Sequence, residues 1–281
     1  MKLLEYNEKT NIKYRQVLHM ENQKTTLQQN HDTIKLTKDE KKNTLFVAHR
    51  GVSNLEKENT CPAFVAAGQR SYFGVECDIH RSLDNVFVVM HDSGFKRVAG
   101  VDKKIADLTY AECAAIPLFG YDGKTSRVDL RAPRVEEYYD ILSHYNKYAV
   151  LELKDEFTNE ELDRIVEIAK SYYHLEKTVF ITFFFDVAKR LRERYPDVVI
   201  QFLAYRPEEG VSLEEHQNRL VDIAIKYNMD LDVYSKTVTP DFIEKIHKAG
   251  HKLNAWTVNE KEEALTLCEW GIDYITTNII E

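Results

Sequence analysis

From residue 45 to the end of the chain, short apolar, β-branched runs alternate with amphipathic stretches of helical periodicity. A strand followed by a helix, repeated with short links, implies parallel strands joined by right-handed crossovers. The runs predict eight strands, at residues 45–49, 74–79, 148–153, 179–183, 198–203, 229–234, 252–257 and 273–276. Eight such units predict an α/β fold, a (β/α)8 TIM-type barrel, with an open doubly wound sheet as the alternative.

Helices are predicted between the later strands, at residues 159–172, 186–195, 212–227, 240–249 and 260–270. Ser212 and Glu215 have the spacing of a capping box, and Thr239 precedes a proline at a first helical position. Gly250 and Gly271 stand where helices should end. These ends keep the links to the following strands short.

The 281 residues divide into an extension and a barrel. Residues 1–44 contain no glycine or proline and are predicted to be a polar N-terminal extension of unassigned role, partly helical or mobile. Residues 45–281 form the predicted barrel, with an insertion at about 92–133 after the second strand. A long excursion inside a compact barrel is usually a lid or a binding insertion.

Composition excludes several classes of function. The formal net charge is −8, and a nucleic-acid-binding face must be basic, so no nucleic-acid partner is expected. The 10 glycines form neither a dinucleotide-binding nor a P-loop pattern. No apolar run is long enough for a transmembrane segment, and none near the start has the length of a signal-peptide core. The 4 cysteines include no C-x-x-C pair, which favours reduced thiols and a cytoplasmic location.

The first predicted strand ends at the sequence His49-Arg50-Gly51. Reactive groups of a barrel of this kind lie at the carboxyl ends of its strands. Arginine offers a fork of donors that matches phosphate or carboxylate, and histidine exchanges a proton near neutral pH. The pair therefore predicts a place where an anion is held, and a polar surface loop is the alternative.

Acidic residues predict a metal site. Glu76, Asp78 and His80 share one face of the second predicted strand, and Glu152 ends the otherwise apolar strand at 148–153. Carboxylates that face inward from buried strands repel one another and need a cation, a proton or an arginine. Oxygen ligands favour a hard ion, so we predict one divalent cation, Mg²⁺ or Ca²⁺. The alternative is a salt bridge of Glu152 with Lys154 or with an arginine.

A second histidine, His91, follows the apolar run 86–90. Two histidines that flank a metal suit the roles of general acid and general base. Most histidines taken singly have a structural role, and His247 with His251 illustrates this. Their spacing resembles a zinc pair, but Gly250 ends the predicted helix between them.

Six ordered motifs make the chain resemble the glycerophosphodiester phosphodiesterase family. The likeness extends from about residue 45 to the C-terminus, and the order and spacing of the motifs agree. The stretches are FVAHRG (46–51), ENTCPAF (58–64), GVECDIHRSLDNVFVVMHD (74–92), LELK (151–154), AWTVNE (255–260) and GIDYITTN (271–278).

The resemblance implies a barrel enzyme that hydrolyses a glycerophosphodiester, a small molecule, to glycerol 3-phosphate and an alcohol. It implies that His49 and His91 are the general acid and base. The three carboxylates named above would hold one divalent cation. The insertion after the His-Asp motif is also a feature of the family.

Four further residues receive roles from the resemblance. Arg50 and Lys154 would hold phosphate oxygens. Glu58 would orient Arg50, and Trp256 would line the glycerol pocket. The family usually has proline where this chain has Lys57, and its closing Thr-Asp pair is Thr-Asn here, which leaves the shape of these loops and the choice of substrate open.

Two other functions are the alternatives. One is a related phosphodiesterase acting on lysophospholipid or sphingomyelin-type substrates, and the other is a barrel that binds phosphorylated ligands without catalysis. The sequence leaves open which histidine is the acid, whether water or the glycerol 2-hydroxyl is the nucleophile, which head group is preferred, and the oligomeric state.

Overall fold

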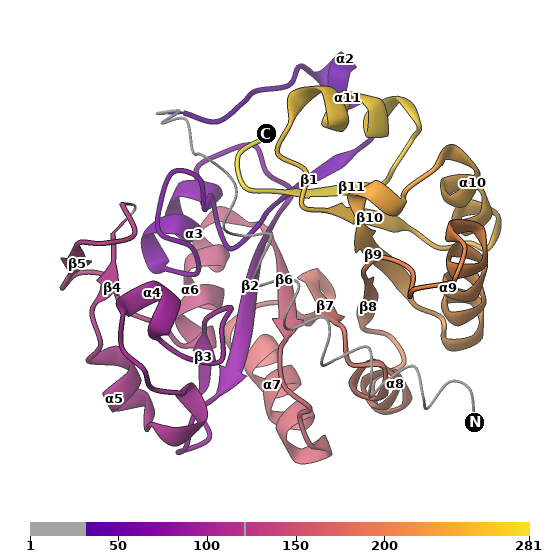
Figure 1. Ribbon diagram of the computed structural model, residues 1–281. Helices are drawn as coiled ribbons and strands as arrows, with labels where there is room; N and C mark the ends of the chain where they lie inside the picture. The colour runs from indigo at the N-terminus through magenta and orange to yellow at the C-terminus, as the bar shows by residue number, and fades with distance from the viewer. Residues whose placement is uncertain (1–31, 121) are drawn as a thin grey trace.

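The computed structural model describes residues 32–120 and 122–281 (Figure 1). Within these residues, eight parallel strands pair side by side in the order β1-β2-β6-β7-β8-β9-β10-β11. Because β1 pairs with both β2 and β11, the sheet closes on itself. The prediction of a (β/α)8 barrel is confirmed, and the alternative prediction of an open doubly wound sheet is wrong.

Every predicted strand is present, with ends that shift by at most two residues. A short strand, β3 (Phe87–Val89), runs antiparallel beside β2. The strands of the barrel are β1 (Leu45–Ala48), β2 (Gly74–Arg81), β6 (Tyr148–Leu153), β7 (Thr178–Thr182), β8 (Val199–Ala204), β9 (Asp230–Tyr234), β10 (Leu253–Trp256) and β11 (Tyr274–Thr277).

Helices surround the barrel, as Figure 1 shows. Thr239 caps α10 as predicted, but only half of the predicted capping box forms at α9, where Ser212 accepts a hydrogen bond from the Glu215 amide. Gly250 and Gly271 follow helices with positive φ, as predicted. The outer helices are α3 (Cys61–Gly68), α6 (Val135–Tyr145), α7 (Asn159–Tyr172), α8 (Phe185–Arg194), α9 (Leu213–Tyr227), α10 (Pro240–Lys248) and α11 (Lys261–Glu269), and short 3-10 turns precede β7 (Leu175–Lys177) and follow β9 (Ser235–Thr237).

Alternate side chains of the strands fill the interior in layers. At the amino end of the barrel, the rings of Phe73 and Tyr148 stack with centroids 4.2 Å apart. Farther toward the carboxyl ends of the strands, Asn254 of β10 donates hydrogen bonds to Gln201 of β8 and to Thr276 of β11. An inner apolar cluster of Val47, Val150, Val179, Ile181 and Leu203 lies among them. The interior is therefore packed, and a substrate must enter at the carboxyl ends of the strands, which we call the mouth.

The insertion at about 92–133 forms a small unit with its own core. It contains α4 (Lys96–Ala99), a 3-10 turn (Ile105–Asp107), α5 (Tyr110–Ala114) and the hairpin of β4 (Leu118–Phe119) with β5 (Ser126–Arg127). Its buried apolar side chains form a cluster separate from the main core: Val88, Met90, Phe95, Val98, Ala99, Ile105, Leu108, Cys113, Leu118, Leu130 and Ala132.

The described end of the N-terminal extension packs against the barrel. Ile34 pairs with Ile280 in a parallel bridge, and the Leu36 amide donates to the Glu281 carbonyl at 2.6 Å. Leu36 is buried in the main core, and α2 (Lys38–Lys41) lies beside α11 (Figure 1). Residues 1–31 lie outside the described part of the chain, and so does the prediction made for them.

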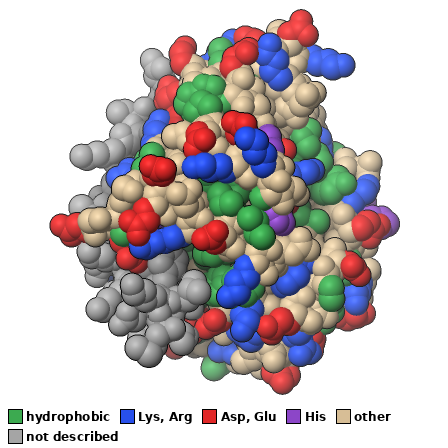
Figure 2. Space-filling model, turned by 90° about the vertical axis from the view of Figure 1, so that its right-hand side faces the viewer, with side chains coloured by type: hydrophobic (Ala, Val, Ile, Leu, Met, Phe, Trp, Pro, Cys, Tyr) green, Lys and Arg blue, Asp and Glu red, His purple; other side chains and the backbone are tan. Residues whose placement is uncertain are grey.

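The outer face on the side of α9 and α10 carries acidic and basic side chains mixed together, with apolar side chains between them (Figure 2). Charges of the two signs are not separated into patches on this face. Among the helices that the structure describes, none has the length and apolar character needed to cross a bilayer.

Candidate active site

Three buried carboxylates lie together at the mouth. Glu76 and Asp78 are two residues apart on β2, so their side chains lie on the same face of the strand. Glu152 on β6 is the register partner of Asp78. One oxygen of each carboxylate lies within 4.8 Å of the others. None of the three residues is more than 9% exposed. We call Glu76, Asp78 and Glu152 the acidic triad; the parallel register of two neighbouring strands brings them together.

Two oxygens of the acidic triad are buried without a donor. Glu76 Oε2 accepts a hydrogen bond from the Arg50 amide, and Asp78 Oδ2 accepts one from Asn59 Nδ2, both at 2.7 Å. Glu76 Oε1 and Asp78 Oδ1 have no hydrogen-bond partner within the described residues. A buried anionic oxygen without a donor costs free energy. Lys154 Nζ, 3.4 Å away, offsets the charge at Asp78 Oδ1, so Glu76 Oε1 is the atom that most needs a cation or a proton.

The pKa values within the acidic triad are pushed apart. Burial raises the pKa of Glu76 well above its usual value, and the charges of Asp78 and Glu152 raise it further. Burial also raises the pKa of Glu152 to about 7, against the opposing effect of Lys154. Burial opposes ionisation of Asp78 too, but Lys154, His91 and Arg50 hold the pKa of this carboxyl well below its usual range. Asp78 is thus held as the anion, while ionisation of Glu76 and Glu152 is opposed until a cation binds beside them.

The residues present fit a hard divalent cation. Carboxylate oxygens on rigid strands are ligands that Mg²⁺ and Ca²⁺ prefer, and Glu76, Asp78 and Glu152 would hold the ion. The alternative of a salt bridge is also realised, because Lys154 Nζ lies 2.9 Å from Glu152 Oε1 and 3.4 Å from Asp78 Oδ1. The ammonium offsets part of the charge but leaves Glu76 Oε1 without a hydrogen-bond partner in the described part of the chain.

Arg50 enters the site through a strained turn after β1. Its φ is +55°, and that of Gly51 is +76°. A Cβ on Gly51 would lie 2.6 Å from Ala63 of α3, so only glycine permits this close approach. The turn aims the Arg50 guanidinium inward, where Nη1 donates to Glu58 Oε1 at 3.1 Å and Nε lies 3.4 Å from Asp78 Oδ2.

His49 is held by the loop that follows β11. Its Nδ1 donates to Asn278 Oδ1 at 2.7 Å, and the same oxygen accepts from Ser53 Oγ at 2.9 Å. When the ring is neutral, this bond leaves Nε2 without a proton and able to accept one. Burial, reinforced by the charge of Arg50, lowers the pKa of His49 to about 3. His49 is therefore a neutral imidazole in this environment.

His91 is held by the next residue along the chain. Its Nδ1 donates to Asp92 Oδ1 at 2.8 Å. Burial, together with the charges of Arg50 and Lys154, lowers the pKa of His91 to about 4, while Asp78 and Asp92 oppose the shift. The two predicted histidines thus share one orientation, with Nδ1 bound and Nε2 available, but His49 has an amide partner and His91 a carboxylate.

Arg97 of the insertion links two carboxylates of the site, Glu58 and Asp92. It donates to Glu58 from Nη1 and Nη2, at 2.8 and 2.7 Å, and to Asp92 from Nε and Nη2, at 2.8 and 3.0 Å. Glu58 in turn holds Arg50, and Asp92 holds His91. Burial opposes ionisation of Glu58, but Arg50 and Arg97 keep the pKa of this carboxyl far below its usual value. One side chain therefore fixes both the arginine and the second histidine.

His80, which shares a face of β2 with Glu76 and Asp78, is bonded to other protein groups. Its Nδ1 pairs with Asp155 Oδ1 at 2.8 Å, and its Nε2 lies 3.1 Å from the His91 carbonyl oxygen. Both ring nitrogens are thus occupied by protein groups. His80 supports the backbone beneath His91 and adds no free nitrogen to the site.

Trp256 lies on the opposite side of the mouth, within an aromatic group. Its ring stacks on Tyr205 with centroids 5.7 Å apart, and it meets Tyr234 and Phe183 edge to face at 6.0 and 5.6 Å. The Trp256 indole donates to the Asp232 carbonyl at 3.2 Å, which fixes its plane. We call Phe183, Tyr205, Tyr234 and Trp256 the aromatic wall.

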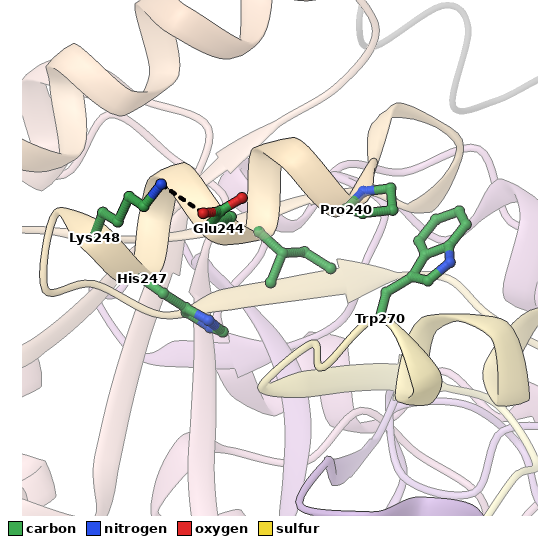
Figure 3. A pocket seen from close by; sticks show the side chains of 6 residues that line it. Pro240, Glu244, His247, Lys248 and Trp270 are labelled. Atoms are coloured by element: carbon green, nitrogen blue, oxygen red, sulfur yellow. Dashed lines mark ion pairs between the residues drawn. The ribbon is translucent and has the colours of Figure 1, made fainter.

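A surface pocket lies away from the mouth, between α10 and α11 (Figure 3). Its wall includes Pro240, His247 and Trp270, and the Lys248–Glu244 ion pair at 2.5 Å runs along its edge. His247 Nε2 pairs with Asp273 Oδ2 at 2.8 Å. The pocket contains none of the predicted site residues. The pairing of His247 with Asp273 agrees with the prediction that this histidine has a structural role.

Several residues of the site received no role from the sequence, although Asn278 stood out there as a departure from the family motif. Arg97, Asn59 and Asn278 each make a direct hydrogen bond to a predicted site residue. Asp232 of β9 is 1% exposed, and its Oδ1 has no hydrogen-bond partner among the residues described. Alternation along β9 could have placed Asp232 and Tyr234 on the inward face, but the partners of Arg97 depend on the path of the insertion.

A (β/α)8 barrel with clustered carboxylates, a buried arginine and lysine, and two oriented histidines at its mouth has the residues of a phosphoric ester hydrolase. The model of the glycerophosphoryl diester phosphodiesterase family matches residues 49–281. The chain belongs to this family, as its six motifs predicted, and is a phosphoric diester hydrolase.

Known proteins share the whole barrel with this chain. The glycerophosphodiester phosphodiesterase of Caldanaerobacter subterraneus is 24% identical over 84% of this chain and 94% of its own. A phosphodiesterase of Oleispira antarctica, solved in complex with the product sn-glycerol-3-phosphate, superposes with a TM-score of 0.73 at 23% identity, covering 83% and 92% of the two chains. The Thermotoga maritima glycerophosphodiester phosphodiesterase gives 0.66 at 26% identity, over 84% and 94%.

Proposed function

We propose that this chain hydrolyses glycerophosphodiesters to glycerol 3-phosphate and an alcohol, using one divalent cation at the acidic triad. Family membership supports hydrolysis of glycerophosphodiesters. The main support for a bound metal is that two buried triad oxygens, Glu76 Oε1 and Asp78 Oδ1, lack a hydrogen-bond partner among the described residues. When bound, the cation polarises the phosphoryl group and offsets the charge that develops in transfer.

The basic residues beside the triad hold the phosphate. Arg50 presents a planar set of donors that is already fixed by Glu58, so little rotational entropy is lost on binding. Lys154 lies beside Asp78 and Glu152 and supplies a second positive charge. Their charges favour an anionic substrate at a mouth that otherwise carries three carboxylates.

The two histidines move protons. Each ring is fixed through Nδ1, so Nε2 is the atom that exchanges a proton with the substrate. One takes the proton of the nucleophile, and the other supplies one to the departing alcohol. Their lowered pKa values favour the neutral form of both rings before substrate binds, and the negative charge of a bound phosphate favours protonation of one of them.

Trp256, the innermost ring of the aromatic wall, receives the glycerol. Trp256 presents a half-buried ring beside the inner cluster, and a ring face suits the C–H side of a polyol while leaving its hydroxyls to polar groups. The Oleispira antarctica structure holds sn-glycerol-3-phosphate, the product expected here.

The test is release of glycerol 3-phosphate from glycerophosphocholine and glycerophosphoinositol, with and without a chelator. We expect release from at least one substrate, its loss with EDTA, and its return with Mg²⁺ or Ca²⁺. Calorimetric titration of each metal into Glu76→Gln and Glu244→Gln separates the triad from other carboxylates, because Glu244 is paired on the outer face. Full activity after exhaustive chelation would refute the metal, and inactivity on every glycerophosphodiester would refute the function.

A further inference from the structure

The aromatic wall ends at an arginine. Arg206 follows β8 directly after Tyr205, and its guanidinium lies over two rings, 4.6 Å from the centroid of Tyr234 and 5.3 Å from that of Tyr205. Its Nη2 also donates to the Tyr234 hydroxyl at 2.7 Å. Two ring contacts and a hydrogen bond give this exposed side chain a defined position.

The strand register places Arg206 at the rim of the mouth. Asp232 is buried in the interior of β9, and Tyr234, two residues on, points to the same side. Trp256 is the register partner of Tyr234 on β10 and packs against the inner cluster. Arg206 rests on these inward-facing rings from the solvent side, so it borders the path by which a substrate reaches the acidic triad.

The path has a buried end and an exposed end. The triad carboxylates at the buried end fix where the phosphate binds, and half-buried Trp256 suits the glycerol. An alcohol esterified to the phosphate that extends from the buried end to solvent on this side of the mouth passes Arg206, which donates to Tyr234 at the rim. The chemistry of this pair therefore bears on the choice of head group.

We propose that Arg206 makes this enzyme select glycerophosphodiesters with a polyol head group over those with a quaternary ammonium. The inference rests on the proposed function and names its substrate class. A trimethylammonium group binds proteins through the faces of aromatic rings. On Tyr205 and Tyr234 that position is already taken by the guanidinium. The same guanidinium offers several N–H donors in one plane, which suit the hydroxyls of an inositol or glycerol head group.

The test compares kcat/KM for glycerophosphoinositol and glycerophosphocholine in the full-length enzyme loaded with its cation. The wild type should prefer the inositol ester. Arg206→Ala exposes both tyrosine faces and removes the donors, so the ratio of the two kcat/KM values should move toward choline by about tenfold. Arg206→Lys keeps a cation on the rings and should retain the preference within about threefold.

The matched control is Lys252→Ala. Lys252 also lies over a tyrosine ring, 5.5 Å from the centroid of Tyr274, and donates to its hydroxyl at 3.2 Å, but at the amino end of the barrel. Its removal should leave the substrate ratio unchanged. A ratio that stays within twofold in Arg206→Ala, in a wild type active on both esters, overturns the role of Arg206 alone. A wild type inactive on both esters overturns the proposed function and this inference with it.

Discussion

The two sides of the mouth are built in different ways. On the side of β1, β2 and β6, buried charges oppose one another, and the loops after the strands position them through hydrogen bonds to Glu58, Asn59 and Arg97. On the side of β7 to β10, aromatic rings pack on one another above a polar layer in which Asn254 is hydrogen-bonded and Asp232 Oδ1 has no hydrogen-bond partner among the described residues. The charged side gathers three carboxylates and their basic partners in one place, whereas the aromatic side presents ring faces with a single buried carboxylate beneath them.

The largest effect should come from the histidines of the charged side. His49→Ala or His91→Ala removes a proton-transfer group, and we expect kcat to fall by about 10³-fold. Circular dichroism and the thermal midpoint should show an intact barrel, because both side chains lie at the mouth, away from the main core. The control is His247→Ala, which changes a histidine paired on the outer face. An equal loss in all three variants would contradict the assignment.

Arg97 tests whether the insertion positions the charged side. Arg97→Met breaks the link between Glu58 and Asp92, and we expect kcat to fall by about 10- to 100-fold as Arg50 and His91 lose their support. KM should change less than kcat, and Arg97→Lys should recover part of the activity. A merely structural role would instead lower the thermal midpoint without a selective fall in kcat.

Arg131→Met is the matched control for Arg97. Arg131 lies in the same insertion and makes a paired contact with Glu137, which is not one of the predicted site residues. Its loss should leave kcat within about twofold. A comparable fall in kcat in both arginine variants would show that the insertion acts through its overall stability and would refute the specific role of Arg97.

Trp256 tests the aromatic side. Trp256→Ala should raise KM by about tenfold and change kcat by less than about threefold, because a ring that only holds the glycerol binds the substrate and the transition state alike. Trp256→Phe should recover most of the affinity. Trp270→Ala, at the outer pocket, should leave both constants unchanged. A fall in kcat alone would place Trp256 with the charged side instead.

The sequence predicted the charged side better than the aromatic side. Glu76, Asp78 and Glu152 interrupt apolar strands, where alternation fixes the face, and a buried carboxylate there has few structural explanations. Tyr205 and Tyr234 give no such signal, since aromatic residues at strand ends are common in barrel cores. Arg97 could not be placed either, because its partners come from distant segments whose approach depends on the packing of the insertion.

The eight strands were predicted because hydrophobic runs and caps act locally, whereas two other features depend on long-range contacts. Pairing of Ile34 with Ile280 extends the packed structure into the segment predicted as a polar extension, which no local pattern indicates. Asn278 departs from the family motif, and the structure places that departure on the hydrogen bond to His49. A motif shows that a residue differs, but only the fold shows which partner the difference affects.

The smallest expected effect concerns the support of the aromatic side. His216 of α9 is buried and its Nε2 donates to the Tyr205 carbonyl at 3.1 Å. Burial lowers the pKa of His216 below its ordinary value of 6.5, and the bond to Tyr205 only partly opposes this. Above pH 6.5 the ring is neutral in the folded and unfolded states, so its contribution to stability is complete there.

As the pH falls below 6.5, the unfolded chain binds a proton at this ring before the folded protein does, so the free energy of unfolding decreases until the pH passes the lowered pKa of the folded state. His216→Gln should therefore reduce the loss of stability between pH 7.5 and 5 while retaining a donor to Tyr205. Urea unfolding of both proteins across this range measures the difference. The same pH dependence in the two proteins would show that His216 is not an acid-sensitive support of the aromatic wall.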